Sequence, residues 1–597
     1  MLTENFETQY KKNLKTSDRK ILAALKIAQE KHKNLYRKSG EPYIEHCIAV
    51  YNILGEWGVN DTNLLIAALL HDTLEDTNLK IEEISKYFGE EVAFLVDSVT
   101  KIRLGVKEGQ DFKTLKKIVG TSYVDPKVSV LKLADRYHNL STLQYLPNSN
   151  RKKKAKESLE IYAKLAESLG MWVVKTKIED LSFQYLNFDN FSKVKTSIDC
   201  DKRLSSTEIE KNLKTIRNAL EKTKIKANVE TKIGGYYSTY QKLKSNAVKG
   251  LASSEDYKKI NDVISYRVAV KSIEQCYEAI YAIHNVYGGK VDFNRFDEFI
   301  GANKRINGYE ALQTTIETDF GSIEIAIAKK DMESFNNWGY VFNLQKGIKN
   351  NNYNLKLIFT PSQDLLFLPE KARAIDFAYV VNQKLGDNSV GVIINGEKKD
   401  LGYILKNADT VEVITGERNT KEDIKLEKIC LRKTHEYLES KIIDNEKKNS
   451  IELGKKIIED RVSPRGILDL EDIGTDVHGI CYSLGCENAG EIYYKISKGY
   501  LDIERLDDLL NEYGVTKNRQ KRTTIETAGI DKPGLLNIIT KSVNKSGGNI
   551  VRIVFNKDKN NVHFYLRIVV ENLKLKDTEI LRKELTNNKY FHKIKIV

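Results

Sequence analysis

The sequence predicts a multidomain protein: an all-α N-terminal domain, an α/β domain, a small β-grasp-like module, a helical region and a C-terminal ferredoxin-like domain. Three observations support this prediction. At 597 residues the chain is too long for a single core. Apolar residues recur at helical spacing up to about residue 195, and short apolar runs of strand length begin after residue 200. The composition, 41% hydrophobic and 30% charged, is that of an ordinary folded protein.

Composition also argues against several classes of protein. No apolar run approaches the roughly 18–20 residues that span a bilayer. The segment Met1–Lys20 is polar and charged, unlike a secretory signal. The six cysteines are scattered without CxxC spacing, which argues against a disulfide framework and a zinc–thiolate site. We therefore expect a cytoplasmic protein with no membrane partner. The net charge of +13 suits polyanionic ligands, but the basic residues are spread over the whole chain.

The elements follow in order along the chain. The first domain, residues 1–195, is expected to be helical, with apolar residues at helical spacing over Ile21–Ala28, Asn63–Leu70, Ile81–Val96, Val128–Leu146 and Ala155–Leu169. Residues 200–345 combine helices with strands, predicted at Ser206–Lys222, Val263–Val270, Ile273–Tyr287, Ala311–Glu317 and Ile323–Ile327. This alternation indicates an α/β domain.

The C-terminal half contains three further regions. Residues 355–416 hold short strands around one helix, predicted at Lys356–Thr360, Leu365–Leu368, Ala374–Leu385, Val390–Ile394 and Val411–Ile414. Residues 417–515 are expected to form charged helices. Residues 520–597 follow the order strand, helix, strand, strand, helix, strand, which is typical of the split βαβ, ferredoxin-like class.

Four residues of the first domain have the chemistry of metal ligands. His71 and Asp72 close the apolar run Leu64–Leu70, so an imidazole and a carboxylate emerge together at a helix end. His46 and Asp135 would complete a set of two nitrogens and two carboxylates. Such a set leaves positions for water and phosphate oxygens and suits a borderline-hard divalent ion such as Mn²⁺. One His–Asp pair alone is more often structural, but four such residues at the edges of apolar helices favour a metal site.

Helical spacing places further polar residues beside these four. Glu75 and Asp76 lie three and four residues after Asp72, and we expect them to project to the same side and to activate an attacking water. Asn139 lies four residues after Asp135, and Thr142 three residues after Asn139. They form a polar line on an otherwise apolar helix, which indicates a bound ligand or mutual hydrogen bonds.

Three segments of the first domain resemble the hydrolase domain of the long RelA/SpoT-homologue proteins, members of the HD phosphohydrolase superfamily. These segments are residues 37–46 (RKSGEPYIEH), 71–76 (HDTLED) and 132–139 (KLADRYHN). The resemblance continues downstream in the family's order: Ile358-Phe-Thr-Pro and Ile375-Asp-Phe-Ala-Tyr resemble its TGS domain, and Asp531-Lys-Pro-Gly-Leu-Leu resembles the opening of an ACT domain.

The resemblance implies an HD-type hydrolase domain at 1–195, a synthetase-like domain of nucleotidyltransferase-like fold at 200–345, TGS at 355–416, a helical domain at 417–515 and ACT at 520–597. It implies Mn²⁺-dependent removal of the 3′-diphosphate from guanosine tetra- and pentaphosphate (ppGpp and pppGpp), which controls the stringent response. The residues that match family positions are the Mn²⁺ ligands His46, His71, Asp72 and Asp135, the water-activating pair Glu75 and Asp76, and Arg37, Ser39, Asn139 and Thr142 around the guanosine. Lys132 and Arg136 are candidates to neutralise the pyrophosphate.

The synthetase-like domain departs from the family's pattern. The family's phosphate-gripping Arg-x-Lys reads Lys232-Ile-Gly234, a Lys is replaced by Asp297, a His by Gln313 and an Arg by Ala328. Asp262 and Glu324 remain where the family has its Mg²⁺ ligand and catalytic carboxylate, and Tyr309 also remains. Phosphoryl transfer depends on charge neutralisation and positioning, so we expect synthetase activity to be lost. Tyr309 leaves open the binding of a second nucleotide without chemistry.

The regulatory regions depart from the family as well. Asn382 ends the TGS helix where the family carries a His that meets tRNA, and the Cys-rich module before ACT is absent. Both departures argue against ribosome and tRNA binding. The ACT-like tail would serve as a homodimer contact or a small-molecule sensor. The sequence leaves three alternatives open: a bifunctional enzyme with weak synthesis, a non-catalytic nucleotide-sensing regulator, and an HD phosphatase for another nucleotide such as a nicotinamide dinucleotide phosphate.

Overall fold

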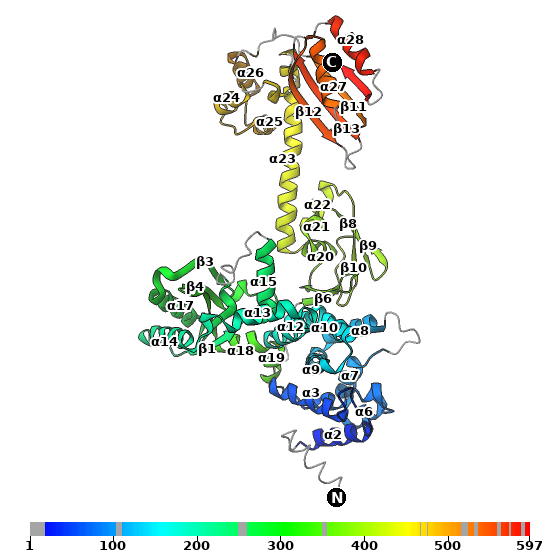
Figure 1. Cartoon of the computed structure of the whole chain (residues 1–597), viewed down its shortest axis with the longest axis vertical. Coiled ribbons are helices and arrows are strands. Elements are labelled where there is room, and N and C mark those ends of the chain that lie inside the picture. The colour runs from blue at the N-terminus through cyan, green and yellow to red at the C-terminus, as the bar shows by residue number, and fades with distance from the viewer. Residues whose placement is uncertain are drawn as a thin grey trace. The chain divides into compact units, whose positions relative to one another are not determined.

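Figure 1 shows the computed structural model of the chain, which forms two compact units. The first is Met1–Arg418 with Ile429–Leu431, and the second is Asn419–Lys428 with Arg432–Val597. The structure describes residues 18–102, 110–248, 260–348, 355–465, 467, 469–473, 476–513, 515, 523–530, 535–557, 563–571, 573, 575–586 and 591–596.

The N-terminal domain consists of packed helices, as the apolar periodicity predicted. Its α-helices are α2 (Arg19–Lys31), α3 (Ile44–Glu56), α4 (Thr62–Leu70), α5 (Thr73–Asp76), α6 (Ile81–Phe88), α7 (Glu90–Val99), α8 (Gln110–Val124), α9 (Lys127–Ser141), α10 (Asn148–Glu157), α11 (Ala163–Ser168), α12 (Trp172–Leu186) and α13 (Phe188–Asp199). Helix α4 is buried on every side, because all seven residues of Leu64–Leu70 are apolar and pack into the core.

Two helices predicted from apolar spacing are irregular. The expected helix Ile81–Val96 is interrupted at Gly89, whose φ of +94° lies outside the right-handed helical region. The expected helix Ala155–Leu169 contains a π-helical turn, Ser158–Tyr162, between α10 and α11. The first prediction was wrong about continuity, because apolar spacing does not reveal the break at Gly89, whereas the second segment stays helical through its π turn.

The α/β domain is built on a five-stranded sheet of order β1-β2-β5-β4-β3, in which β2 and β5 are parallel and the other pairs antiparallel. Its elements are α14 (Ser206–Lys222), β1 (Asn228–Ile233), α15 (Tyr236–Val248), β2 (Ile264–Val270), α17 (Ile273–Tyr287), β3 (Val291–Glu298), β4 (Leu312–Thr318), β5 (Gly321–Lys329), α18 (Lys330–Trp338) and α19 (Tyr340–Gln345). The predicted bounds of α14 and α17 are confirmed. Strands β1 and β3 were missed, because both are polar strands at the sheet edges.

The next module has two small sheets, β6-β7 and β10-β8-β9, joined by a parallel bridge between Phe359 and Thr410. Its elements are β6 (Leu355–Phe359), β7 (Leu365–Pro369), α20 (Ala374–Val381), α21 (Gln383–Asp387), β8 (Ser389–Ile394), β9 (Glu397–Lys399) and β10 (Val411–Thr415). The expected helix Ala374–Leu385 divides at Asn382, whose side chain caps α21. The module packs on the N-terminal helices: Phe359 meets Phe112 of α8 with ring centroids 5.1 Å apart.

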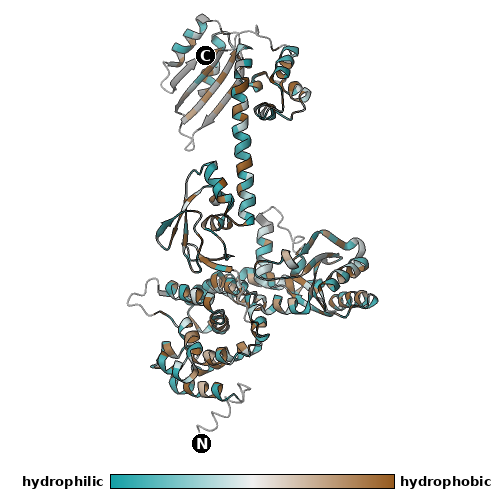
Figure 2. Ribbon diagram, turned by 180° about the vertical axis from the view of Figure 1, so that it is seen from behind, coloured by the Kyte–Doolittle hydropathy of each residue, from teal (hydrophilic) through white to brown (hydrophobic). Residues whose placement is uncertain are grey.

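The second unit begins with helices, including the long and mainly hydrophilic α23 (Figure 2). Its helices are α22 (Thr420–Glu427), α23 (Arg432–Val462), α24 (Asp476–Ser483), α25 (Ala489–Ser497) and α26 (Ile503–Glu512). A four-stranded antiparallel sheet of order β12-β13-β11-β14 follows. Its elements are β11 (Thr523–Ile530), α27 (Leu535–Lys545), β12 (Asn549–Lys557), β13 (His563–Glu571), α28 (Leu575–Thr586) and β14 (Phe591–Ile596).

The predicted order of strands and helices in this tail is confirmed. The motif predicted to open it, Asp531–Gly534, lies outside the described residues. Within the described parts of the chain, no helix is both long enough and apolar enough to cross a membrane.

Candidate functional site

The four predicted metal ligands converge on one point of the N-terminal domain. His46 lies in α3, His71 and Asp72 follow the buried helix α4, and Asp135 lies in α9. The Nε2 atoms of the two imidazoles are 3.2 Å apart. Asp72 Oδ2 lies 3.4 Å from His46 Nε2 and 3.3 Å from His71 Nε2, and Asp135 Oδ1 lies 3.2 and 3.8 Å from the same atoms. The ligand atoms of His46, His71 and Asp72 all lie within 4.8 Å of one another, close enough to share one divalent cation, and Asp135 Oδ1 lies against both imidazoles.

Both imidazoles have a partner at the nitrogen that faces away from this centre. His71 Nδ1 lies 2.8 Å from the carbonyl oxygen of Ala68, an atom that can only accept. His71 must therefore carry its proton on Nδ1, which leaves a lone pair on Nε2 for a metal. His46 Nδ1 lies 2.8 Å from Nδ1 of His138. Both imidazole ligands are almost completely buried, so the donor set fits a metal ion.

The two carboxylates are fixed by neighbouring donors. Tyr43 donates its hydroxyl proton to Asp72 Oδ2 at 2.8 Å. Lys132 Nζ donates to Asp135 Oδ2 at 2.7 Å, and Asn139 Nδ2 donates to Asp135 Oδ1 at 2.5 Å. Burial alone would raise the pKa of Asp135, but Lys132 and the imidazoles outweigh it and hold that pKa well below its ordinary value. The oxygens facing the centre are therefore anionic at neutral pH.

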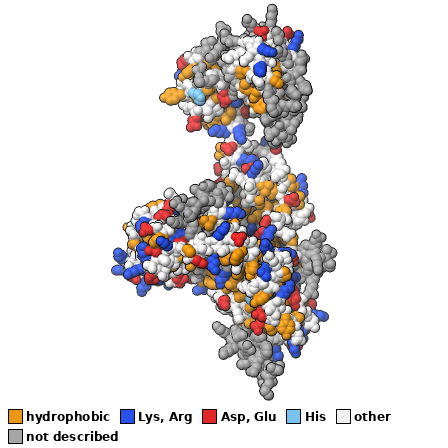
Figure 3. Space-filling model, viewed as in Figure 1, with side chains coloured by type: hydrophobic (Ala, Val, Ile, Leu, Met, Phe, Trp, Pro, Cys, Tyr) orange, Lys and Arg blue, Asp and Glu red, His pale blue; other side chains and the backbone are white. Residues whose placement is uncertain are grey.

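A pocket of about 320 Å³ opens onto this centre. The predicted guanosine residues Arg37, Ser39, Asn139 and Thr142 all line it, and Arg37 Nη2 donates to Asn139 Oδ1 at 2.8 Å. Basic side chains make up much of the wall: Arg37, Lys38, Lys101, Lys132, Arg136 and Lys154. A cationic wall around a carboxylate–imidazole centre suits a phosphorylated ligand. Elsewhere, on the face shown in Figure 3, Lys and Arg are interspersed with Asp and Glu.

The predicted acidic pair is arranged differently from expectation. Glu75 is buried, and it accepts hydrogen bonds of 2.6 Å from both the backbone nitrogen and Nζ of Lys101. Asp76 is exposed. Neither residue is among those that line the pocket. The expectation that Glu75 projects with Asp72 into the site is not met, because Lys101 holds its carboxylate.

Three residues around the centre were not singled out from the sequence. Tyr43 holds Asp72, His138 contacts His46, and His32 stacks on the Tyr43 ring with centroids 5.0 Å apart. Tyr43 and His138 both lie inside the motifs that carried the family resemblance. Their aromatic side chains within those motifs could have identified Tyr43 and His138 as site residues.

A second pocket, of about 420 Å³, lies between α12 and the α/β domain and includes the three synthetase-type residues Asp262, Tyr309 and Glu324. Lys242 forms an ion pair with Asp262. Glu324 Oε1 accepts from Ser265 Oγ at 2.9 Å and lies 3.9 Å from Nη1 of Arg267, which also donates to the Tyr309 hydroxyl at 3.2 Å. The acids of this pocket are thus already paired with its cations.

The backbone at Gly234 and Gly235 is closely packed. A Cβ on Gly234 would lie 2.5 Å from the carbonyl oxygen of Asp262, and a Cβ on Gly235 would lie 2.7 Å from Thr176 Cγ2. A long basic side chain therefore has no room at position 234. The Arg305 guanidinium lies over the rings of Phe299 and Tyr309, 4.2 and 5.3 Å from their centroids, and so covers one face of Tyr309.

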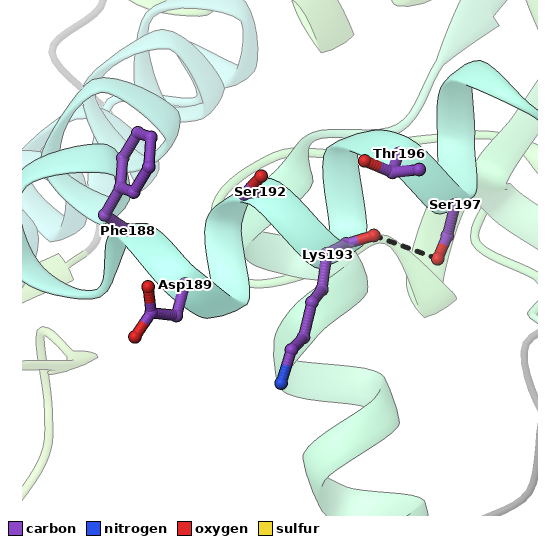
Figure 4. Close-up of a pocket in the computed structure, with 6 residues that line it drawn as sticks. All are labelled: Phe188, Asp189, Ser192, Lys193, Thr196 and Ser197. Carbon is purple, nitrogen blue, oxygen red and sulfur yellow. Dashed lines mark hydrogen bonds between the residues drawn. The ribbon is translucent and has the colours of Figure 1, made fainter.

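A further hollow follows one face of α13 (Figure 4). Its six labelled lining residues all belong to this helix, and the hydrogen bond drawn joins Ser197 Oγ to the backbone oxygen of Lys193. It gathers no convergent set of polar groups from other described elements, so it is not a candidate active site.

Comparison with known families matches three regions of the chain. Residues 24–172 match the HD domain, residues 232–345 match a region found in RelA / SpoT proteins, and residues 357–415 match the TGS domain. The first match contains all four converging ligands, and the second contains most of the second pocket.

Several curated proteins are similar over most of their length. A protein of Aquifex aeolicus named guanosine-3′,5′-bis(diphosphate) 3′-pyrophosphohydrolase is 30% identical over 90% of this chain and 90% of its own. One of the same name from Borreliella burgdorferi is 31% identical over 73% of this chain and 70% of its own. The bifunctional (p)ppGpp synthase/hydrolase RelA of Mycobacterium tuberculosis is 30% identical over 87% of this chain and 77% of its own.

Proposed function

Because the chain belongs to the long RelA/SpoT-homologue family, we propose that its N-terminal domain hydrolyses the 3′-diphosphate of ppGpp and pppGpp. The products are GDP or GTP and pyrophosphate. The observation that carries the proposal is the convergence of His46, His71, Asp72 and Asp135 on one point at the base of a cationic pocket. The relatives' names supply the substrate class.

The proposed cofactor is Mn²⁺, held by the two imidazoles and two carboxylates. When bound, such an ion polarises a phosphate oxygen and lowers the pKa of a coordinated water. Arg37 and Asn139, already hydrogen-bonded to each other, would hold the guanosine with Ser39 and Thr142. Lys101, Lys132, Arg136 and Lys154 would neutralise the phosphates, because they line the same pocket.

Glu75 and Asp76 are proposed to orient the attacking water and accept its proton. Lys101 contacts Glu75 and also lines the pocket, so phosphate binding by Lys101 would release the Glu75 carboxylate. Exposed Asp76 lies one residue further and interacts electrostatically with Tyr43. Under this assignment, substrate entry would free the Glu75 carboxylate to act as the general base.

We propose that the α/β domain has lost synthetase activity. Its Mg²⁺-type and catalytic carboxylates are paired with Lys242 and Arg267, and position 234 cannot hold a phosphate-binding Lys without moving the Asp262 backbone. A second nucleotide could bind there only with displacement of Arg305 from Tyr309. If ppGpp synthesis is lost, the alternative of a bifunctional synthetase and hydrolase is excluded.

The C-terminal tail is proposed to be an ACT domain of ferredoxin-like fold. Its strand order β12-β13-β11-β14, with two helices in a βαββαβ sequence, supports this assignment. Homodimer formation through this sheet is part of the proposal. Asn382, which stands where the family carries the His that meets tRNA, instead caps α21. The TGS region is therefore not proposed to bind tRNA. The enzyme is proposed to act in the cytoplasm.

The test is a product assay with 3′-labelled ppGpp and Mn²⁺, run beside ATP plus GDP and beside a nicotinamide dinucleotide phosphate. Pyrophosphate release from ppGpp alone is expected. The double variant Glu75→Gln/Asp76→Asn should bind ppGpp as the wild type does but lose turnover by about a hundredfold or more. Equal binding without turnover by either protein would establish a non-catalytic sensor instead. Appreciable ppGpp synthesis would refute the loss of synthetase activity.

A further inference from the structure

The two imidazoles at the metal centre differ in what stands behind them. His71 is backed by a backbone carbonyl, whereas His46 is backed by the ring of His138. A carbonyl oxygen has no proton, so His71 has one tautomer available when it donates to Ala68. An imidazole can either donate or accept, so the His46–His138 contact has two arrangements, and they are not equivalent for metal binding.

The geometry at the centre selects between these arrangements. His46 Nε2 is the atom that faces His71 Nε2, Asp72 and Asp135. A ring nitrogen can bind a metal only when it carries no proton, so neutral His46 must carry its proton on Nδ1. That proton points at His138 Nδ1, which lies 2.8 Å away. His138 must then present a lone pair at Nδ1 and carry its own proton on Nε2.

We propose that His138 is a positioning residue that fixes the metal-binding tautomer of His46 by accepting its Nδ1 proton. This inference rests on the proposed metal site and adds a residue to it. His138 lies in α9, three residues after Asp135, so the same helix supplies one ligand and the support of another. The two rings are 4.8 Å apart between centroids, and His138 is not among the residues that line the pocket. Its role is therefore exerted through His46 and not on the substrate.

The arrangement also predicts which substitutes can replace His138. The acceptor atom is bonded directly to Cγ in both histidine (Nδ1) and asparagine (Oδ1). Asparagine can therefore accept from His46 at nearly the same place. Glutamine carries its amide one carbon further out, near the position of Nε2, although its size is closer to that of histidine. A role in packing alone would favour glutamine, whereas the proposed role favours asparagine.

The experiment measures Mn²⁺ binding by titration calorimetry on chelator-treated full-length protein, without any substrate. His138→Ala should weaken Mn²⁺ binding about 10- to 100-fold, the usual effect of losing an outer-shell partner. His138→Asn should bind within about threefold of wild type, and His138→Gln should resemble the alanine variant. Ser141→Ala is the matched control: this exposed α9 side chain bonds only within its own helix, to Tyr137, and it should bind Mn²⁺ as the wild type does.

Melting temperatures of the metal-free variants separate weaker binding from failure to fold. The proposal is overturned if correctly folded His138→Ala binds Mn²⁺ within twofold of wild type, or if glutamine restores binding better than asparagine. His71→Ala identifies the source of a failure. If His71→Ala abolishes saturable Mn²⁺ binding while His138→Ala does not change it, the metal site is supported and the proposed role of His138 is wrong. If the wild type shows no Mn²⁺ binding that depends on His71, both the proposed metal site and the proposed role of His138 are wrong.

Discussion

The two pockets of the first unit use the same kinds of side chain in opposite ways. Around His46 and His71, Asp72 Oδ2 and Asp135 Oδ1 lie against the imidazole nitrogens, while Lys132 pairs with the outer oxygen of Asp135, Oδ2, and further cations line the surrounding wall. In the α/β domain, Asp262 and Glu324 are instead paired with Lys242 and Arg267. The first arrangement leaves anionic oxygens directed at one centre, where a cation and a phosphate can be added. The second satisfies its charges internally.

This difference is the physical basis for proposing that the second pocket has lost its activity. Arg267 and Glu324 are largely buried, and an unpaired charge in a protein interior is strongly unfavourable, so these two side chains pair, whereas Lys242 and Asp262 are more exposed. Once Lys242 and Arg267 neutralise the retained acids, a metal–phosphate complex must displace them to bind. In the N-terminal pocket the side chains that face Asp72 Oδ2 and Asp135 Oδ1 are imidazoles, which give up a proton to a metal far more readily than Lys or Arg does.

The largest expected effect removes a ligand from the first pocket. Asp135→Asn keeps the shape of the side chain but lowers its charge and its affinity for a metal. Hydrolysis of ppGpp should fall by about a thousandfold or more, since metal activation contributes several kcal/mol and each 1.36 kcal/mol is tenfold in rate. The rise in melting temperature on adding Mn²⁺ should disappear too. Asp262→Asn is the matched change in the second pocket, and a comparable loss of hydrolysis there would contradict the separation of the two pockets.

A smaller effect is expected from adding volume at Gly234. Gly234→Ala places a Cβ 2.5 Å from the Asp262 carbonyl oxygen, so it should destabilise the α/β domain by roughly 1–3 kcal/mol. Differential scanning calorimetry would report a lower melting temperature with ppGpp hydrolysis retained. Gly120→Ala in α8 is the control, because no atom lies within 4 Å of its added Cβ. Equal melting temperatures for the two variants would show that position 234 has room for a side chain.

The smallest expected effect is a dependence of stability on pH in the second pocket. Burial raises the pKa of Glu179, on its α12 wall, to about 7, although Lys175 opposes the shift. Because this folded-state pKa lies above the unfolded value of about 4.5, its stabilising contribution is complete below pH 4.5 and is lost as pH rises through 7. Glu179→Gln should therefore raise the melting temperature relative to wild type more at pH 8 than at pH 5. An equal difference in melting temperature between variant and wild type at both pH values would contradict the raised pKa of Glu179.

Much of the architecture could be predicted from local patterns. The bounds of α14 and α17 follow from apolar spacing that begins and ends with capping residues. Strands β1 and β3 were not predictable in this way, since their stability comes from pairing with a neighbour and not from apolar alternation. The break at Gly89 and the π turn at Ser158–Tyr162 preserve the buried face and so leave no periodic signal.

The sequence by itself determined the chemistry available at the candidate site: two imidazoles and two carboxylates at the edges of apolar helices, followed by an acidic pair. These features are local, because residue type and helical period are readable from neighbouring positions. Only the tertiary structure decided which groups meet. It brought His138 behind His46, Lys101 onto Glu75 and the Asp262 carbonyl against Gly234. Such contacts join residues far apart in the chain, and close packing of the whole domain fixes them rather than any local preference.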